Sequence, residues 1–236
     1  MTAEDVLNEL KSLGSPSCKK MLMTNHGVGE PCFGVKIGDM KTIQKKIKKD
    51  YKLALDLYDT GNYDAMYFAG LIADDARMTK PDLQRWVNNA KGGALPGSTV
   101  AWVAAQSPHG WELGLKWIDS SSPHIAQAGW STLRSLVALT DDSQLDLAKL
   151  KQLIQRVHKS INSAPDVVRY AMNDFLIAVG CYVVPLHEVA RTTAGKIGHV
   201  SADLGNNSCQ MPYAPNVIDK AIARGTPGKK RKTVKC

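Results

Sequence analysis

The sequence predicts an all-α protein, a HEAT-like (armadillo-type) solenoid of stacked antiparallel helix pairs. Three long stretches place apolar residues at the three-to-four spacing of helices, from Asn62 to Met78, from Ser122 to Leu139 and from Asp166 to Val183. Two of them also align with each other at an offset of 42 residues, and a two-helix HEAT-like unit has ~40 to 47 residues. An irregular helical domain with chance similarity is the alternative.

The stretch from Asp166 to Val183 is the element around which we expect the other helices to pack. Pro165 and Asp166 are typical of a helix start, because proline fits the first turn and an acid interacts favourably with the helix dipole. The apolar residues that follow occupy most of the helix circumference: Val167, Tyr170, Ala171, Phe175, Ala178, Val179 and Tyr182. Such a helix must be covered on several sides.

The internal repeat relates this helix to the stretch from Ser122 to Leu139. The aligned pairs are Pro123 with Pro165, Gly129 with Ala171, Leu133 with Phe175 and Val137 with Val179. Small residues in the middle of these helices, together with Ala69 and Gly70 in the third stretch, predict that neighbouring helices approach one another closely.

The remaining elements follow from helix breakers and apolar spacing. In the first half we expect helices at Ala3–Leu13 and Pro16–Thr24, a glycine-rich loop at Asn25–Gly38, and helices at Asp39–Asp50, Tyr51–Asp59 and Pro81–Asn89. In the second half we expect helices at Ser98–Ser107, Pro108–Ser121, Leu145–Ile161, Leu186–Ile197 and Asn216–Arg224. The segment His199–Pro215 is expected to be an ordered excursion.

Length and composition indicate a soluble protein of one domain, residues 1–225, followed by a flexible basic tail, residues 226–236. Hydrophobic residues make up 44% and charged residues 22% of the 236. No apolar run approaches the ~20 residues of a membrane helix, and the N-terminal stretch has no secretory apolar region. We therefore expect a cytoplasmic location and no membrane partner.

The sequence shows little sign of metal or cofactor chemistry. The five cysteines are scattered without a C-x-x-C pair, which favours reduced thiols over a disulfide framework or a zinc site. His199 and Cys209 are candidate metal ligands, but two candidates without a second spaced pair are a weak signal. No Walker loop or G-x-S-x-G motif is present, which argues against nucleotide and serine hydrolases. We expect no metal and no cofactor.

The net charge of +8 is concentrated in two segments. Residues 39–52 hold six lysines and two aspartates, and residues 224–236 hold six basic residues and no acid. Such clusters are expected where a protein meets a polyanion, and a solvated helix face with a frayed tail is the other interpretation. Lys41, Lys45, Lys48 and Lys52 are predicted to form one row on a helix, where phosphate contacts would offset their mutual repulsion.

Four segments together resemble the DNA alkylation-repair proteins built from HEAT-like repeats, the superfamily of the AlkC- and AlkD-type alkylbase DNA glycosylases. They are FGVKIGDMKTIQKKIKKDY, NYDAMYFAGLIADD, PDVVRYAMNDFLIAVG and the ending GKKRKTVKC. The resemblance spans most of the chain. It implies a curved solenoid with a positively charged concave surface for duplex DNA, and hydrolysis of the N-glycosidic bond of N3- or N7-alkylated purines.

The catalytic pattern of that family is incomplete in this chain. AlkD-type enzymes have an aspartate four residues after a tryptophan, whereas Trp102 is followed four residues later by Gln106, which cannot carry a negative charge. The corresponding helix of the later repeat has Arg169, Asn173 and Asp174 where that family has tryptophan and arginine.

Asp174 is the only acid beyond the first turn of its apolar helix, and a carboxylate there needs a partner. One interpretation is an ion pair with Arg134 or Arg169. The other makes Asp174 the catalytic carboxylate, with Trp102, Trp111 or Trp130 as an aromatic wall beside the lesion. Tryptophans on apolar helices are, however, more often core residues.

The sequence therefore predicts a monomeric alkylation-repair protein that binds duplex DNA. Three functions remain open: an alkylpurine DNA glycosylase, a catalytically silent DNA-binding relative, and a scaffold that holds a peptide. The expected DNA-binding residues are Lys41, Lys45, Lys48, Lys49, Arg134, Arg169, Lys229, Lys230, Arg231 and Lys232. The expected catalytic residues are Asp174, Trp102 and Trp130.

Overall fold

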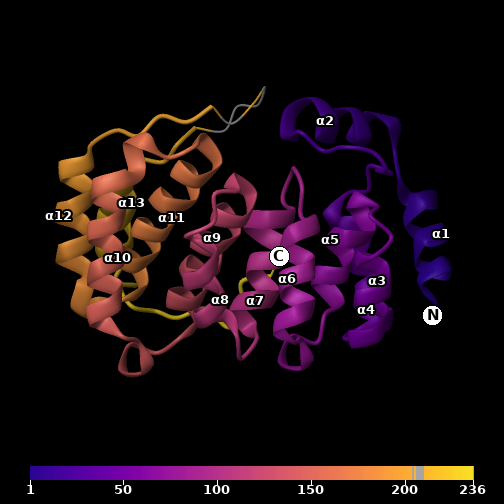
Figure 1. The fold of residues 1–236 in the computed structure, drawn as a ribbon, viewed down its shortest axis with the longest axis horizontal. Helices are drawn as coiled ribbons and strands as arrows, with labels where there is room; N and C mark the ends of the chain where they lie inside the picture. The colour runs from indigo at the N-terminus through magenta and orange to yellow at the C-terminus, as the bar shows by residue number, and fades with distance from the viewer. Residues whose placement is uncertain (204, 206–209, 236) are drawn as a thin grey trace. The chain divides into compact units, whose positions relative to one another are not determined.

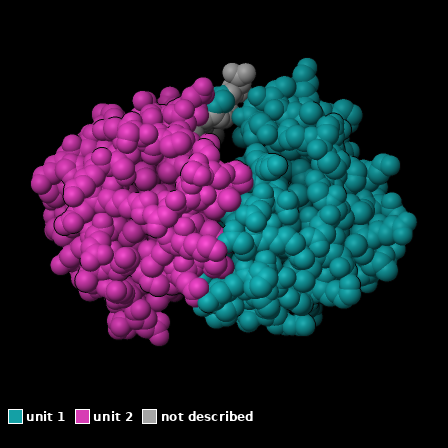
Figure 2. Space-filling view, viewed as in Figure 1, with its two compact units in different colours: residues 1–109, 205–208, 235–236 teal, residues 110–204, 209–234 magenta. Residues whose placement is uncertain are grey.

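The described part of the chain folds into helices joined by turns and loops. The computed structural model describes residues 1–203, 205 and 210–235, and these residues form thirteen α-helices and no strand (Figure 1). The chain separates into two compact units, which Figure 2 colours separately. Unit 1 comprises residues 1–109, 205–208 and 235–236, and unit 2 comprises residues 110–204 and 209–234. The single domain expected over residues 1–225 stays a prediction.

Unit 1 contains the first seven α-helices, centred on α5. They are α1 (Ala3–Leu13), α2 (Pro16–His26), α3 (Ile37–Ile47), α4 (Tyr51–Tyr58), α5 (Tyr63–Ile72), α6 (Lys80–Asn89) and α7 (Ala101–Gln106). A 3-10 turn, η1 (Asp75–Arg77), follows α5, and a π-helical turn, η2 (Leu95–Val100), leads directly into α7. Every residue of α5 is buried, because α1, α3, α4 and η2 all pack against it.

Unit 2 is organised around α11. Its α-helices are α8 (Gly110–Trp117), α9 (Pro123–Leu139), α10 (Leu147–Ser160), α11 (Asp166–Tyr182), α12 (His187–Ile197) and α13 (Ala214–Ala223). The short turns η3 (Asp142–Gln144), η4 (Ile161–Ser163) and η5 (Val184–Leu186) lie between them. α11 contacts α9, α10, α12 and α13, which confirms that this apolar helix is covered on several sides.

Among the described residues, no single helix is long and apolar enough to cross a membrane. Within residues 1–203, 205 and 210–235, one pair of helical segments, Asp166–Tyr182 and Val184–Ile197, has the length and composition for it, and that pair is bent by 116°.

Polar side chains cap the starts of α1, α5 and α6. Thr2 and Thr79 each accept a hydrogen bond from the backbone N–H three residues later, and Asp5 and Asp82 reciprocate in capping boxes. Asn62 accepts from the backbone N–H of Ala65 at 3.1 Å and so starts α5. These caps satisfy N–H groups that the helix itself leaves unpaired.

A buried carboxylate ties the loop before α3 to the central helix of unit 1. Asp64 of α5 is fully buried and accepts hydrogen bonds from the backbone N–H groups of Phe33, Gly34 and Val35 at 2.6, 3.1 and 2.8 Å. Gly34 has a φ of 77°, and a Cβ there would lie 2.4 Å from the backbone nitrogen of Lys19. Only glycine fits this position, and the loop reaches α3 along a fixed path.

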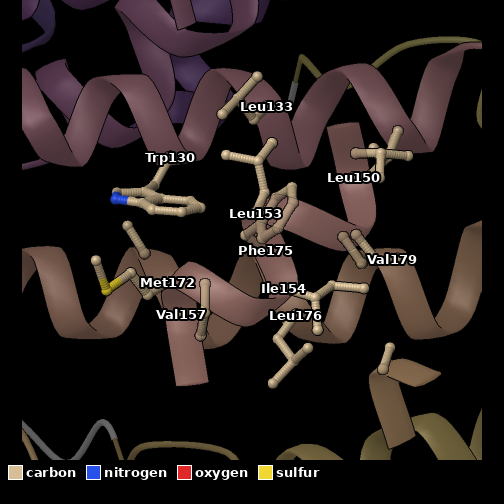
Figure 3. Close-up of a cluster of buried hydrophobic side chains, with 14 of the residues drawn as sticks. Trp130, Leu133, Leu150, Leu153, Ile154, Val157, Met172, Phe175, Leu176 and Val179 are labelled. Carbon is tan, nitrogen blue, oxygen red and sulfur yellow. The ribbon is translucent and has the colours of Figure 1, made fainter. Parts of the chain in front are cut away.

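The core of unit 2 lies between α9, α10 and α11 (Figure 3). Trp130 of α9 and Phe175 of α11 are fully buried, and their ring centroids are 5.2 Å apart. Leu153 and Val157 of α10 complete the cluster. Three of the aligned pairs of the repeat are buried in this structure: Gly129 with Ala171, Leu133 with Phe175 and Val137 with Val179.

Small residues allow the close helix packing that the sequence predicted. A Cβ on Gly129 of α9 would lie 2.6 Å from the backbone nitrogen of Ile118 and 2.9 Å from the carbonyl carbon of Trp117. In unit 1, a Cβ on Gly70 would lie 2.5 Å from Cγ2 of Thr99. At these two places a neighbouring segment occupies the space that a larger side chain would need.

Several boundaries differ from the sequence prediction. The helix expected at Asp39–Asp50 is α3, Ile37–Ile47, and it ends where Lys48 adopts a φ of 64°. The helix expected at Pro108–Ser121 is confined to α8, Gly110–Trp117. Part of the excursion expected at His199–Pro215, including Cys209, lies outside the described residues. In the remainder, the rings of His199 and Tyr213 stack with centroids 4.2 Å apart.

Candidate nucleic-acid interface

Unit 1 presents Lys41, Lys45 and Lys46 of α3 to solvent, and Lys46 pairs with Glu9 at 2.7 Å. Lys41 and Lys45 lie one turn apart and are exposed, and neither has an acidic partner within the described part of the chain. Met40 and Ile43 of the same helix are buried, which fixes the direction of the exposed face. Because Asp64 holds the loop before α3, Lys41 and Lys45 extend from a helix whose start is fixed.

The single row of four lysines predicted from the sequence is wrong. α3 ends before Lys48, whose backbone leaves the helical region, and Lys52 lies on α4, where its Nζ is 2.7 Å from the carboxylate of Asp56. Lys49 remains exposed, with its Nζ 3.6 Å from the buried carboxylate of Asp75. The helix break at Lys48 therefore separates residues that the three-to-four spacing had aligned.

In unit 2, the basic tail divides into an anchored lysine and exposed cations. The Nζ of Lys230 lies 2.8 Å from the carboxylate of Asp142 and donates to the carbonyl of Val137 at 2.9 Å. The backbone N–H groups of Gly228 and Arg231 donate to the carbonyls of Cys181 and Ala138 at 2.9 and 2.8 Å. Lys229, Arg231 and Lys232 remain exposed. No sequence pattern indicated these contacts, because their partners are far away along the chain.

In unit 1, Lys235 forms an ion pair with Asp75. The two charged groups are 2.7 Å apart, and their side chains are only 10% and 3% exposed. The ammonium also donates to the carbonyl of Ala73 at 3.3 Å. Burial lowers the pKa of Lys235, and the neighbouring Asp75 carboxylate opposes that effect. Because the pair is buried, removal of either partner would leave the other charge uncompensated and would destabilise the protein.

Asp75 is a residue that the sequence reasoning missed. Gln106 occupies the position where the AlkD-type pattern has its aspartate, and its Nε2 donates to Asp75 at 3.1 Å. A carboxylate therefore does lie beside that position, but η1 supplies it instead of α7. The signal in the sequence was the acidic pair Asp74–Asp75 directly after an almost wholly apolar helix.

In unit 2, Asp174 of α11 pairs with Arg134 of α9 at 2.9 Å. Burial raises the pKa of the Asp174 carboxyl, and Arg134 acts in the opposite direction. Both residues line a cavity of about 220 Å³ that Tyr182 and Arg231 also border. One of the two interpretations of Asp174, the ion pair with Arg134, is thus present, and its catalytic role stays a prediction.

Arg169 is bonded within the protein instead. Its guanidinium donates to the backbone carbonyls of Ser201 and Ala164 at 2.6 and 2.9 Å and lies 3.5 Å from Asp166. Phosphate contacts by Arg169 or Arg134 would have to be added to these existing bonds, and this DNA-binding role stays a prediction.

The tryptophans proposed as an aromatic wall are core residues in this structure. Trp102 is 4% exposed and makes an edge contact with Tyr67, with centroids 5.7 Å apart. Trp130 is fully buried against Phe175, and Trp111 packs partly buried against the same core. Because the rings of Trp102 and Trp130 are enclosed, contact with a lesion would require the core to open. Their catalytic roles stay predictions.

Comparison with known proteins decides the family. The model of the family described as DNA alkylation repair enzyme matches residues 6–189. The chain belongs to the DNA alkylation repair enzyme family. This family member is 29% identical to the uncharacterized protein Lin0241 of Listeria innocua and 28% identical to the uncharacterized protein Lmo0209 of Listeria monocytogenes, in each case over 95% of this chain and 99% of the relative.

The structure of this alkylation-repair family member is also similar to a solved one. That protein belongs to a new family related to the HEAT-like repeat DNA glycosylases, with affinity for branched DNA structures. The TM-score is 0.91 and the identity 38%, over 100% of both chains. These findings confirm the resemblance and the all-α HEAT-like fold predicted from the sequence.

Proposed function

We propose that this protein binds DNA through its phosphates and favours branched DNA over an uninterrupted duplex. The observation that carries the proposal is the full-length similarity, at 38% identity, to a protein with affinity for branched DNA structures. Membership of the DNA alkylation repair enzyme family supports the same class of ligand. DNA repair proteins meet strands with ends and junctions, so such a preference suits the family.

The exposed cations are the groups that would contact phosphates. In unit 1 these are Lys41 and Lys45 of α3 and Lys48 beyond it. In unit 2 they are Lys229, Arg231 and Lys232 of the tail. The anchored Lys230 and Lys235 would hold the tail in place, since their ammonium groups already have acidic partners.

Equilibrium binding of a four-way junction and of a linear duplex of equal length tests the proposal. The junction should bind more tightly, and log K for both should fall linearly with log salt, because phosphate contacts release counterions. Equal affinities would reject the preference for branches. Binding without salt dependence would reject the phosphate contacts and favour the peptide scaffold.

Excision of alkylated purines is a second candidate, supported by the family and by the cavity beside Asp174. An N3- or N7-alkylated purine carries positive charge and leaves readily. Water adds to the sugar carbon C1′ as the glycosidic bond breaks, and a carboxylate stabilises the positive charge on the sugar. The ion pair of Asp174 with Arg134 would have to rearrange to expose that charge.

Release of 7-methylguanine and 3-methyladenine from methylated DNA tests this candidate. Wild-type protein should release both bases, and Asp174→Asn should abolish release while leaving junction affinity within about twofold. Release that survives the substitution would remove Asp174 from the mechanism. No release by the wild type would leave the DNA-binding function alone.

A further inference from the structure

A cationic cavity lies between α13, the end of α11 and the tail of unit 2. Its volume is about 410 Å³, and its basic lining residues are Lys220, Arg224, Lys229, Lys230 and Arg231. Among the described residues that line it there is no aspartate or glutamate. We call this space the tail pocket.

The positive charge of the tail pocket is largely unbalanced. Lys230 pairs with Asp142, but Lys220, Arg224, Lys229 and Arg231 have no acidic partner in the portion of the chain that the structure describes. Four like charges around one cavity repel one another and raise the local positive potential. An anion bound among them would relieve that repulsion.

Backbone hydrogen bonds form the pocket without a ligand. The N–H of Thr226 donates to the carbonyl of Ala221 at 3.2 Å, and the N–H of Gly228 donates to Cys181 at 2.9 Å. Gly228 has a φ of 74°, and a Cβ there would lie 2.4 Å from Cγ2 of Val184, so the turn requires glycine. The cations that follow this turn are therefore placed before any ligand arrives, which lowers the entropic cost of binding.

A bare phosphate would not fill the pocket or contact all of its wall. Tyr182, Val217 and Ala221 add an aromatic ring and apolar surface to the lining. Small-molecule sites usually measure ~300 to 1,000 Å³ and combine apolar walls with a few polar groups. Arginine binds phosphate oxygens through two parallel hydrogen bonds, and aromatic rings stack on bases.

We propose that the tail pocket binds one phosphorylated nucleotide unit, with the phosphate on Arg224 and Arg231 and the nucleoside against Tyr182 and Ala221. The unit is either the 5′-phosphorylated end of a DNA strand or a free nucleoside monophosphate. Binding of a strand end rests on the proposed function, whereas binding of the free nucleotide does not. The site is a pocket for a single unit, distinct from the exposed lysines of α3.

Fluorescence anisotropy of a labelled 5′-phosphorylated thymidine dinucleotide tests the proposal on the full chain. Loss of the 5′-phosphate should weaken binding about tenfold, which is ~1.4 kcal/mol. The double variant Arg224→Gln, Arg231→Gln should lose binding by at least the same factor. Ala221→Phe keeps the charge and fills the space, so it should also lose binding. Lys151→Gln, an exposed lysine of α10 outside the pocket, is the matched control and should stay within about twofold.

Competition distinguishes the two possible ligands, a free nucleotide and a phosphorylated strand end. If unlabelled thymidine monophosphate displaces the probe at a similar concentration, the pocket takes a free nucleotide. If only the phosphorylated oligonucleotide competes, the pocket takes a strand end. Circular dichroism of each variant checks that the helices are retained.

Two results would overturn the assignment. One is the absence of binding of the labelled 5′-phosphorylated dinucleotide by wild-type protein, and the other is wild-type affinity in Ala221→Phe and in the double arginine variant. Junction affinity of the wild-type protein separates the two proposals: nucleotide binding without junction binding would reject only the proposed function.

Discussion

The ammonium of Lys235 lies 2.7 Å from the carboxylate of Asp75, and both side chains are almost completely enclosed within unit 1. Lys49 at 3.6 Å and Gln106 at 3.1 Å approach the same carboxylate. A basic residue of the tail is therefore part of the interior of the protein. This cation is enclosed and paired, so it contributes to the stability of the fold.

Lys235→Met should destabilise the protein by about 3 kcal/mol, the lower end for a buried ion pair that loses one partner. The lower end applies because Lys49 and Gln106 still compensate part of the Asp75 charge. Urea unfolding measures the change. Lys232→Met, an exposed lysine of the same tail, is the control and should change stability by less than about 0.5 kcal/mol. Equal effects of the two substitutions would contradict the internal role of Lys235.

Gly129→Ala should destabilise unit 2 by about 1 to 3 kcal/mol, because the new methyl group would meet the backbone of Ile118. Alanine is otherwise the better helix former. Gly195→Ala in α12, where the methyl group meets open space, should therefore stabilise by up to about 1 kcal/mol. Opposite signs in thermal unfolding confirm the close contact of α9 with the end of α8, and stabilisation by both substitutions would refute it.

Asp174→Asn should remove a decrease in stability with rising pH that the wild-type carboxyl causes. The ordinary pKa of the carboxyl is 3.8, and burial raises it in the folded state. Between these two pKa values the folded state holds more protons, so wild-type stability falls as pH rises through that window. The unfolding free energy of wild type minus that of Asp174→Asn should thus decrease from below pH 3.8 upward and then level off. A difference that increases with pH would contradict the burial of this group.

Lys41→Gln combined with Lys45→Gln should weaken DNA binding and reduce its salt dependence. If each lysine contacts one phosphate, the slope of log K against log salt should decrease by about 0.9 for each lysine removed. Lys52→Gln removes one charge from a lysine already paired with Asp56, and its slope should stay close to wild type. A junction-binding titration at four salt concentrations measures both, and identical slopes in all three proteins would exclude α3 from the interface.

Local sequence patterns were sufficient for most of the helices. The helix expected from Asp166 to Val183 is α11, Asp166–Tyr182, because its starting residues and apolar spacing act within a few turns. Gly129 was correctly linked to close packing for the same reason. The break at Lys48 was missed, since six lysines in one segment gave the appearance of a continuous charged helix.

Contacts between residues that are distant along the chain could not be predicted from the sequence. Asp75 and Lys235 are separated by most of the chain, and nothing near either residue indicates the other. Trp102 and Trp130 show the same limit, because composition does not tell an enclosed ring from one that faces a ligand. The partner of Asp174 was narrowed to two arginines, and only the packing of α9 on α11 selected Arg134.

The four lysines of the tail differ in how accessible their side-chain amines are. Acylating reagents attack accessible amines, so Lys229 and Lys232 should be modified quickly, while Lys230 and Lys235, which are largely buried beside Asp142 and Asp75, should be shielded. Mass spectrometry of the C-terminal peptide would then report, in a single sample, whether the tail is docked. Acetylation in the cell would be expected to fall on the first pair of lysines and to leave the second pair intact.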